Sequence, residues 1–125
     1  MNIAIVGATG NVGRKTLEVL EKKEFPIDNL YLVASSKSAG KKIDFKGKEY
    51  EVIDLEKFDF SNVKIAFFVA GGSISEKFAE KAAEHCMVID NSSFYRMDPD
   101  VPLIVPQVNS DHLNQIKKNI IANPN

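Results

Sequence analysis

The sequence predicts an α/β fold with a doubly wound, mostly parallel sheet and a small inserted hairpin. Two observations support this prediction. Strand-like and helix-like segments alternate along most of the chain, as in a parallel sheet with helices on both faces. The first strand also runs directly into the glycine-rich turn Gly7-Ala-Thr-Gly-Asn-Val-Gly13, which opens a helix. This strand–turn–helix unit makes the expected fold Rossmann-like, and such folds bind ligands at the carboxyl ends of their strands.

Five elements are expected in the first half of the chain. Short apolar runs predict two strands, and apolar or small side chains at helical spacing between them predict a helix. The polar stretch that follows has Lys46-Gly47-Lys48 between two strand-like segments, which indicates a hairpin inserted between the βα units. In chain order, these elements are a strand at 2–6, a helix after Gly13 that ends by Pro26, a strand at 30–34, and hairpin strands at 43–45 and 49–53.

The second half of the chain is expected to continue the alternation. Its most apolar segment, residues 64–70, predicts a strand buried on both faces. The helix after it carries apolar side chains on one side. A later helix has Ser110 or Asp111 as its expected N-cap. In chain order, these elements are a strand at 64–70, a helix at 75–85, strands at 87–90 and 103–105, a helix at 110–117 and a strand at 119–122.

Composition indicates one domain, residues 1–125, and argues against several functions. The net charge of −1 gives no electrostatic reason to expect nucleic-acid or anionic-membrane binding, and 44% hydrophobic residues suffice for a core. No apolar run approaches the roughly 20 residues that span a bilayer, and no basic stretch typical of a signal peptide opens the chain. The single cysteine excludes an intrachain disulfide and a cysteine metal cluster. We therefore expect a cytoplasmic protein.

The glycine loop after the first strand is expected to hold the phosphates of a nucleotide. Gly7 lets the chain turn sharply off the strand, Gly10 lets backbone approach a phosphate, and Gly13 lets the helix pack closely on the sheet. The amides at the helix N-terminus then face the phosphate with a favourable dipole. Thr9 and Asn11 add side-chain donors, with hydrogen bonding inside the turn as the alternative role for both.

The loop after the second strand indicates which dinucleotide binds. A carboxylate about 20 residues past the glycines, bonded to the ribose, is typical of NAD sites. Here the strand runs into Ser35, Lys37 and Ser38, and the first carboxylate is Asp44. Hydroxyls and an ammonium group favour a 2′-phosphate, which a carboxylate would repel. The sequence therefore predicts NADP as the cofactor; the alternative is a solvated lysine–serine loop.

The loop after the strand at 64–70 is a third candidate for ligand binding. Gly71 and Gly72 allow close approach to a ligand, and the helix that follows offers its N-terminal amides. Ser73 completes this loop. Capping of the helix by Ser73 or Ser75 is an alternative that is compatible with ligand binding.

The segment after the strand at 87–90 is the fourth candidate. It is densely polar, with Asn91 at its start and Arg96 at its end. The planar guanidinium group of Arg96 fits a carboxylate or a phosphate. A solvated surface charge is the alternative role for this arginine.

The cysteine and the two histidines are not expected to act chemically. Cys86 lies on the apolar side of a helix and is expected in the core, because free cysteine is among the most buried residue types. His85 and His112 have no adjacent nucleophile and are expected on helix surfaces. The spacing of these residues does not support a metal site.

Several stretches of the chain together resemble the N-terminal part of bacterial aspartate-semialdehyde dehydrogenase. The glycine loop is shared with many reductases, but the polar block that ends in Arg96 and the proline-containing block after it are specific to this family. The resemblance runs from end to end. The matching stretches are Gly7 to Gly13, Ala34 to Lys41, Ala70 to Ser73, Val88 to Arg96, Asp100 to Asn109 and Ile120 to Asn125.

The resemblance implies NADP-dependent reductive dephosphorylation of aspartyl 4-phosphate to the semialdehyde, a step toward lysine, threonine, methionine and diaminopimelate. By motif, residues 9–12, including Val12, would bind the cofactor pyrophosphate, and residues 70–73 would line the cofactor cleft. Ser35, Lys37 and Ser38 would hold the 2′-phosphate. Arg96 would bind the substrate phosphate, with Asn91 in the same block.

The chain departs from the family pattern at three places. Lys37 stands where arginine is expected, which keeps the charge but loses the planar fork, and Gln107 stands where glutamate is usual. The family's nucleophilic cysteine follows an asparagine that corresponds to Asn125, the last residue here. We therefore expect a truncated chain without the catalytic cysteine and histidine, the arginine for the substrate carboxylate and the domain that forms a homodimer.

Two alternatives to this assignment remain open at the level of sequence. The first is a stand-alone NADP-binding regulatory module without enzymatic activity, which a stop codon after Asn125 would favour. The second is a fragment of N-acetyl-glutamyl-phosphate reductase, which is built in a similar way. The Ser-Ala-Gly-Lys and Asn-Ser-Ser blocks favour aspartate-semialdehyde dehydrogenase.

Overall fold

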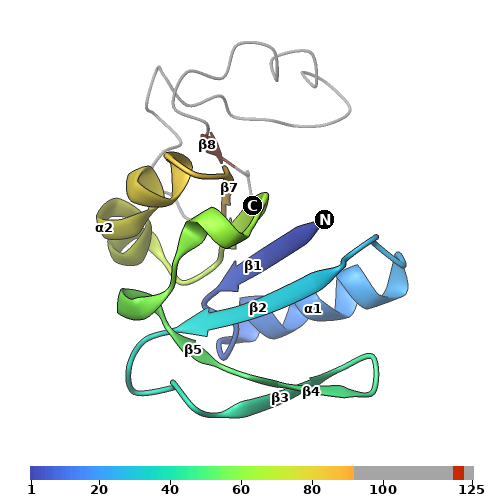
Figure 1. Cartoon of the computed structure of the whole chain (residues 1–125). Helices are drawn as coiled ribbons and strands as arrows, with labels where there is room; N and C mark the ends of the chain where they lie inside the picture. Colours follow the sequence, from blue (N-terminus) through green and yellow to red (C-terminus); the bar gives the residue numbers. More distant parts are fainter. Residues whose placement is uncertain (92–119, 123–125) are drawn as a thin grey trace.

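The computed structural model describes residues 1–91 and 120–122. Within these residues, the main sheet has six strands that all pair in parallel, in the order β5-β2-β1-β6-β7-β8 (Figure 1). This arrangement confirms the predicted doubly wound, Rossmann-like α/β fold. The strands are β1 (Asn2–Val6), β2 (Asn29–Ala34), β5 (Ile53–Asp54), β6 (Ile65–Phe68), β7 (Met87–Asp90) and β8 (Ile120–Ala122).

Two helices, α1 (Asn11–Lys22) and α2 (Gly72–Ala83), cover opposite faces of the sheet. Leu17 and Leu20 of α1 belong to the same apolar cluster as Ile3 and Ile5 of β1. Phe78, Ala79 and Ala82 of α2 instead share a cluster with Ala4 and Val6. Alternate residues of a strand point to opposite faces, so β1 lies in the centre of the sheet with a helix on each side.

The predicted hairpin is present and forms a separate two-stranded antiparallel sheet. It consists of β3 (Lys42–Phe45) and β4 (Lys48–Glu51), joined by the two-residue turn of Lys46 and Gly47. Both turn residues have positive φ angles, 51° and 77°, and such turns match the twist of a hairpin. Phe45 is buried in the cluster that contains α1, so the hairpin packs on the α1 side of the main sheet.

Several element boundaries differ from the predictions. The helix α1 begins at Asn11, before Gly13, so the last glycine of the loop lies inside the helix. Ile53 was expected in the hairpin but belongs to β5, which pairs with Val33 and Ala34 of β2 in the main sheet. The next apolar strand, β6, ends at Phe68 rather than at residue 70, and α2 begins at Gly72 rather than at residue 75.

Two short 3₁₀ helices that the sequence did not predict connect β5 to β6. They are η1 (Leu55–Lys57) and η2 (Phe60–Asn62), and the side chains of Asp54 and Asp59 cap them. The predicted strand at 103–105 and helix at 110–117 lie outside the described residues. Within the described part of the chain, no helix is long and apolar enough to cross a membrane.

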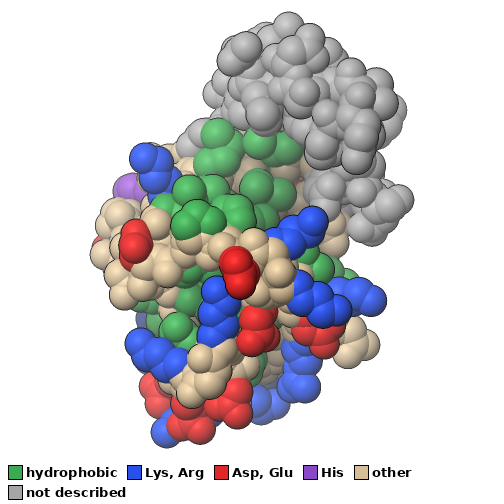
Figure 2. All heavy atoms as spheres, turned by 90° about the vertical axis from the view of Figure 1, so that its right-hand side faces the viewer, with side chains coloured by type: hydrophobic (Ala, Val, Ile, Leu, Met, Phe, Trp, Pro, Cys, Tyr) green, Lys and Arg blue, Asp and Glu red, His purple; other side chains and the backbone are tan. Residues whose placement is uncertain are grey.

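One face of β6, β7 and β8 is only partly covered. Their residues on the α2 side, among them Ala66, Phe68 and Val88, are fully buried, whereas Phe67 and Ile89 on the other side are half-buried. A groove of about 220 Å³ lies there, lined mainly by Val12 and Val19 of α1, Phe67, Val69 and Ile89. Figure 2 shows hydrophobic side chains gathered on one side of the molecule.

Candidate nucleotide-binding site

The glycine loop packs tightly at two of its three glycines and leaves space at the other. Gly7 has a φ of +98°, and a Cβ atom there would lie 2.8 Å from the Cβ of Ala70. A Cβ atom on Gly13 would lie 2.2 Å from the carbonyl oxygen of Gly7. Around Gly10, in contrast, the nearest atom would be 3.5 Å away. The first and third glycines are therefore needed for packing, whereas Gly10 leaves space beside the backbone.

Both helices begin at the carboxyl edge of the sheet without a side-chain cap. The N-cap residues are Gly10 for α1 and Gly71 for α2, and neither helix has an acidic residue in its first turn. Capping by Ser73 or Ser75, the alternative considered for α2, is therefore wrong: the chain enters the helix through Gly71, with a φ of +98°. Helix N-termini of this kind favour anions.

A cavity of about 290 Å³ brings the loops after β1, β2 and β6 together. Its wall includes Gly7, Thr9 and Gly10 from the first loop and Ser35 from the second. The hydroxyl of Thr9 also donates to the Ser38 hydroxyl across 3.4 Å, which joins the first two loops. The complete lining is Val6, Gly7, Thr9, Gly10, Ala34, Ser35, Leu55, Val69, Ala70 and Ile74.

The other predicted site residues that the structure describes do not line this cavity. Lys37 is exposed on the second loop and Ser38 is half-buried; Asn11, Gly71 and Ser73 are exposed, and Gly72 is half-buried at the first position of α2. Val12 and Asn91 line the separate groove beside α1. Gly13 is buried within α1. Arg96 and His112 lie outside the described residues.

Sequence reasoning missed three residues near the cavity. Leu55 and Ile74 supply apolar walls, one after β5 and the other in the first turn of α2. Asp54 lies at the end of β5, beside Ala34 of β2, and shares a smaller cavity of about 130 Å³ with Ser35. Its carboxylate accepts a hydrogen bond from the Glu56 amide at 3.1 Å. Only the recognition of β5 as a strand could have placed Asp54 and Leu55 here, whereas Ile74 directly follows the predicted loop at 70–73.

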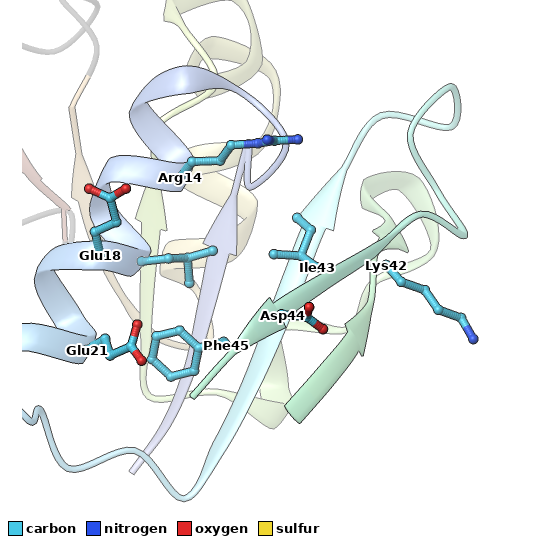
Figure 3. A pocket seen from close by; sticks show the side chains of 8 residues that line it. Arg14, Glu18, Glu21, Lys42, Ile43, Asp44 and Phe45 are labelled. Atoms are coloured by element: carbon cyan, nitrogen blue, oxygen red, sulfur yellow. The ribbon is translucent and has the colours of Figure 1, made fainter. Parts of the chain in front are cut away.

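A second cavity, of about 330 Å³, lies between α1 and the hairpin. Figure 3 shows Arg14, Glu18 and Glu21 on the helix side and Ile43 and Phe45 on β3. Its lining includes none of the residues predicted from the strand-end loops. In the described part of the chain, no group of three or more acidic, histidine or cysteine side chains could hold a metal ion.

Cys86 is buried, as predicted, and its thiol donates to the carbonyl oxygen of Ala82 at 3.3 Å. Burial raises the pKa of the Cys86 thiol to about 11. At neutral pH this side chain is therefore a neutral thiol rather than a nucleophilic thiolate. His85 is exposed, as expected.

We expect Cys86 to react at least about 100-fold more slowly with a thiol reagent at pH 8 than an exposed cysteine, because both access and the thiolate fraction are low. The measurement is labelling followed by mass spectrometry, before and after denaturant is added. Lys64→Cys provides an exposed thiol in the same protein as the control. Equal labelling of both thiols in buffer would contradict the burial of Cys86.

These features define a class of protein: an α/β dinucleotide-binding domain with its site at the carboxyl edge of a parallel sheet. The family model described as "Semialdehyde dehydrogenase, NAD binding domain" matches residues 2–116. The chain therefore belongs to the semialdehyde dehydrogenase family and corresponds to its NAD-binding domain. The relatives favour aspartate-semialdehyde dehydrogenase over the two alternatives, a regulatory module and N-acetyl-glutamyl-phosphate reductase.

Individual aspartate-semialdehyde dehydrogenases also match nearly the whole chain. The aspartate-semialdehyde dehydrogenase of Aquifex aeolicus is 56% identical over 98% of this chain, and that of Shewanella violacea is 48% identical over 99%. The chain spans only 37% of the length of each. A solved structure of aspartate-semialdehyde dehydrogenase II from Vibrio cholerae, complexed with ASA, matches with a TM-score of 0.95 and 52% identity, over 99% of this chain and 41% of that one.

Proposed function

We propose that this domain binds NADP as the nucleotide-binding part of an aspartate-semialdehyde dehydrogenase. The main support is that three strand-end loops meet at one cavity, beside two helix N-termini that no described side chain caps. The open space beside Gly10 fits a phosphate group close to the backbone. NADPH, when bound, would supply hydride to the substrate.

Different residues of the site would bind different parts of the cofactor. The amides of residues 9–12 would hold the pyrophosphate at the start of α1. Leu55 and Ile74 offer apolar surface for the adenosine half of the cofactor. The exposed Lys37, with Ser35 and Ser38, would bind the 2′-phosphate. The loop at 70–73 would line the cleft on the side of α2.

The substrate and assembly of the whole protein are part of the same proposal. The substrates would be aspartyl 4-phosphate and aspartate semialdehyde, with Arg96 and Asn91 holding the phosphate. The homodimer would form through chain that the longer relatives carry beyond the matched region. A cytoplasmic location stays a prediction from the sequence.

We expect NADP to bind roughly 10- to 100-fold more tightly than NAD, because a charge-assisted hydrogen bond contributes about 1.5–3 kcal/mol. Titration calorimetry with both nucleotides measures this ratio. Lys37→Glu should abolish or reverse the preference through repulsion of the 2′-phosphate. Lys64→Glu, the same charge change on an exposed residue at the opposite edge of the sheet, should leave the ratio unchanged. Equal affinities for the two nucleotides in the unmodified chain would refute the NADP assignment, and Asp54 would then be the carboxylate to examine.

A further inference from the structure

A buried polar pair joins α2 to β7. The hydroxyl of Ser75 donates to a carboxylate oxygen of Asp90 at 2.6 Å, and both residues are fully buried. They are the two fully buried polar side chains among the described residues. A hydrogen bond to a carboxylate shielded from water is short, directional and stronger than one between neutral groups. It therefore fixes the orientation of the two elements more narrowly than apolar contacts do.

The two residues lie at the carboxyl edge of the sheet, next to the proposed cofactor site. Ser75 is in the first turn of α2, and its amide donates to the Gly71 carbonyl oxygen at 3.2 Å. Its neighbour Ile74 lines the 290 Å³ cavity. Asp90 is the last residue of β7 and precedes Asn91, whose amide donates to the Phe68 carbonyl oxygen at 2.9 Å.

At the start of α2, the half-buried Ile74 packs against the apolar cluster and Ser75 is fully buried. Along the helix, Ser75 is the first buried side chain, and Phe78 and Ala79 follow one turn later. The connection from β6 includes Gly71, around which a Cβ atom would meet nothing within 4 Å. The bond between Ser75 and Asp90 therefore adds a directional, buried hydrogen bond to the apolar packing of Ile74 at the helix start.

We propose that Ser75 and Asp90 are positioning residues for cofactor binding. Their hydrogen bond holds the first turn of α2, with the amides of Gly72 and Ser73 and the side chain of Ile74, at a fixed place beside the cavity. It also links this turn to the end of β7, where Asn91 follows Asp90. This inference rests on the proposed function, because it assigns the pair a role in the same site.

The test compares Ser75→Ala with Cys86→Ala. Each variant removes one buried hydrogen-bond donor. Ser75 lies in the first turn of α2 beside the cavity, whereas the Cys86 thiol lies just beyond the last turn and donates to Ala82. Both should lower the melting temperature. Only Ser75→Ala should weaken NADP binding, by about tenfold in calorimetry. Ser75→Thr, which keeps the hydroxyl, should restore most of the affinity.

A second measurement tests, without any ligand, whether the Ser75–Asp90 hydrogen bond links the first turn of α2 to the end of β7. In amide nuclear magnetic resonance spectra, Ser75→Ala should shift the signals of both Gly72 and Asn91, whereas Cys86→Ala should shift neither. Equal NADP affinity in Ser75→Ala and Cys86→Ala, with unmoved Gly72 and Asn91 signals, would overturn the positioning role and leave the proposed function intact. A wild-type chain that does not bind NADP would contradict both.

Discussion

Gly13→Ala is expected to lower the stability of the domain strongly. The new Cβ atom would lie 2.2 Å from the Gly7 carbonyl oxygen and 2.8 Å from the Ala8 Cα atom, and both are backbone atoms. Backbone cannot move aside as a flexible side chain can, so α1 would have to separate from the loop and from β1. Overpacking typically costs about 1–3 kcal/mol and occasionally more. Because the contacts are with backbone atoms, we expect a loss near 3 kcal/mol, a large part of the 5–15 kcal/mol that stabilises a typical domain.

Urea unfolding followed by circular dichroism measures this loss. Gly10→Ala is the matched control, since its Cβ atom would meet nothing closer than 3.5 Å and its φ is −80°. That variant should fold with nearly unchanged stability but bind NADP more weakly, because its methyl group enters the space beside the loop. A Gly13→Ala protein with the wild-type unfolding midpoint would contradict the close contact between the loop and the helix.

Residues 1–125 are also expected to form no NADPH from aspartate semialdehyde and phosphate. In the family that the sequence resembles, the reaction in this direction requires a thiolate that adds to the aldehyde carbon of the semialdehyde. The only cysteine here is buried, and its pKa is raised to about 11, so it is neither accessible nor ionised at neutral pH. Covalent catalysis and positioning together contribute many orders of magnitude to a rate, so the loss should be complete.

The assay compares residues 1–125 with a chain extended by the region that the longer relatives carry. Both proteins should bind NADP, and only the extended one should turn over. Turnover by residues 1–125 alone would contradict the assignment of Cys86 as a buried, unreactive core residue. An inactive extended protein that still binds NADP would instead favour a regulatory module.

The sequence was sufficient to predict the elements with strong local patterns. The apolar runs of β1, β2, β6 and β7 and the helical spacing in α1 and α2 identify them without tertiary information. The two residues of β5 were missed because so short a strand carries no period, and its pairing with Val33 and Ala34 is set by the rest of the sheet. Helix starts were placed too late because Gly10 and Gly71 begin the helices without a side-chain cap.

The site was predictable to the extent that it follows from topology. Carboxyl ends of neighbouring parallel strands lie at one edge, so the loops with Thr9, Ser35 and Ala70 could be expected to meet, and they line one cavity. The sequence could not place Leu55 there, because that requires knowledge of β5. The sequence offered capping of α2 only as an alternative role for Ser75, whereas its hydroxyl donates to Asp90, and no local signal reveals a hydrogen bond between distant buried residues.

The strand order has a consequence for how this domain can assemble. Every described strand of the main sheet pairs with at least one strand that precedes it in the chain, apart from β1, which comes first. A chain that emerges from the ribosome can therefore add β2 and β5 outward on one side before β6 arrives. The longest closure is the return of β6 to β1, where Ile65 pairs with Ile3. The entropic cost of closing a loop rises only slowly with its length, by about 0.6 kcal/mol for each doubling. The sheet can therefore grow during synthesis from its centre toward both edges.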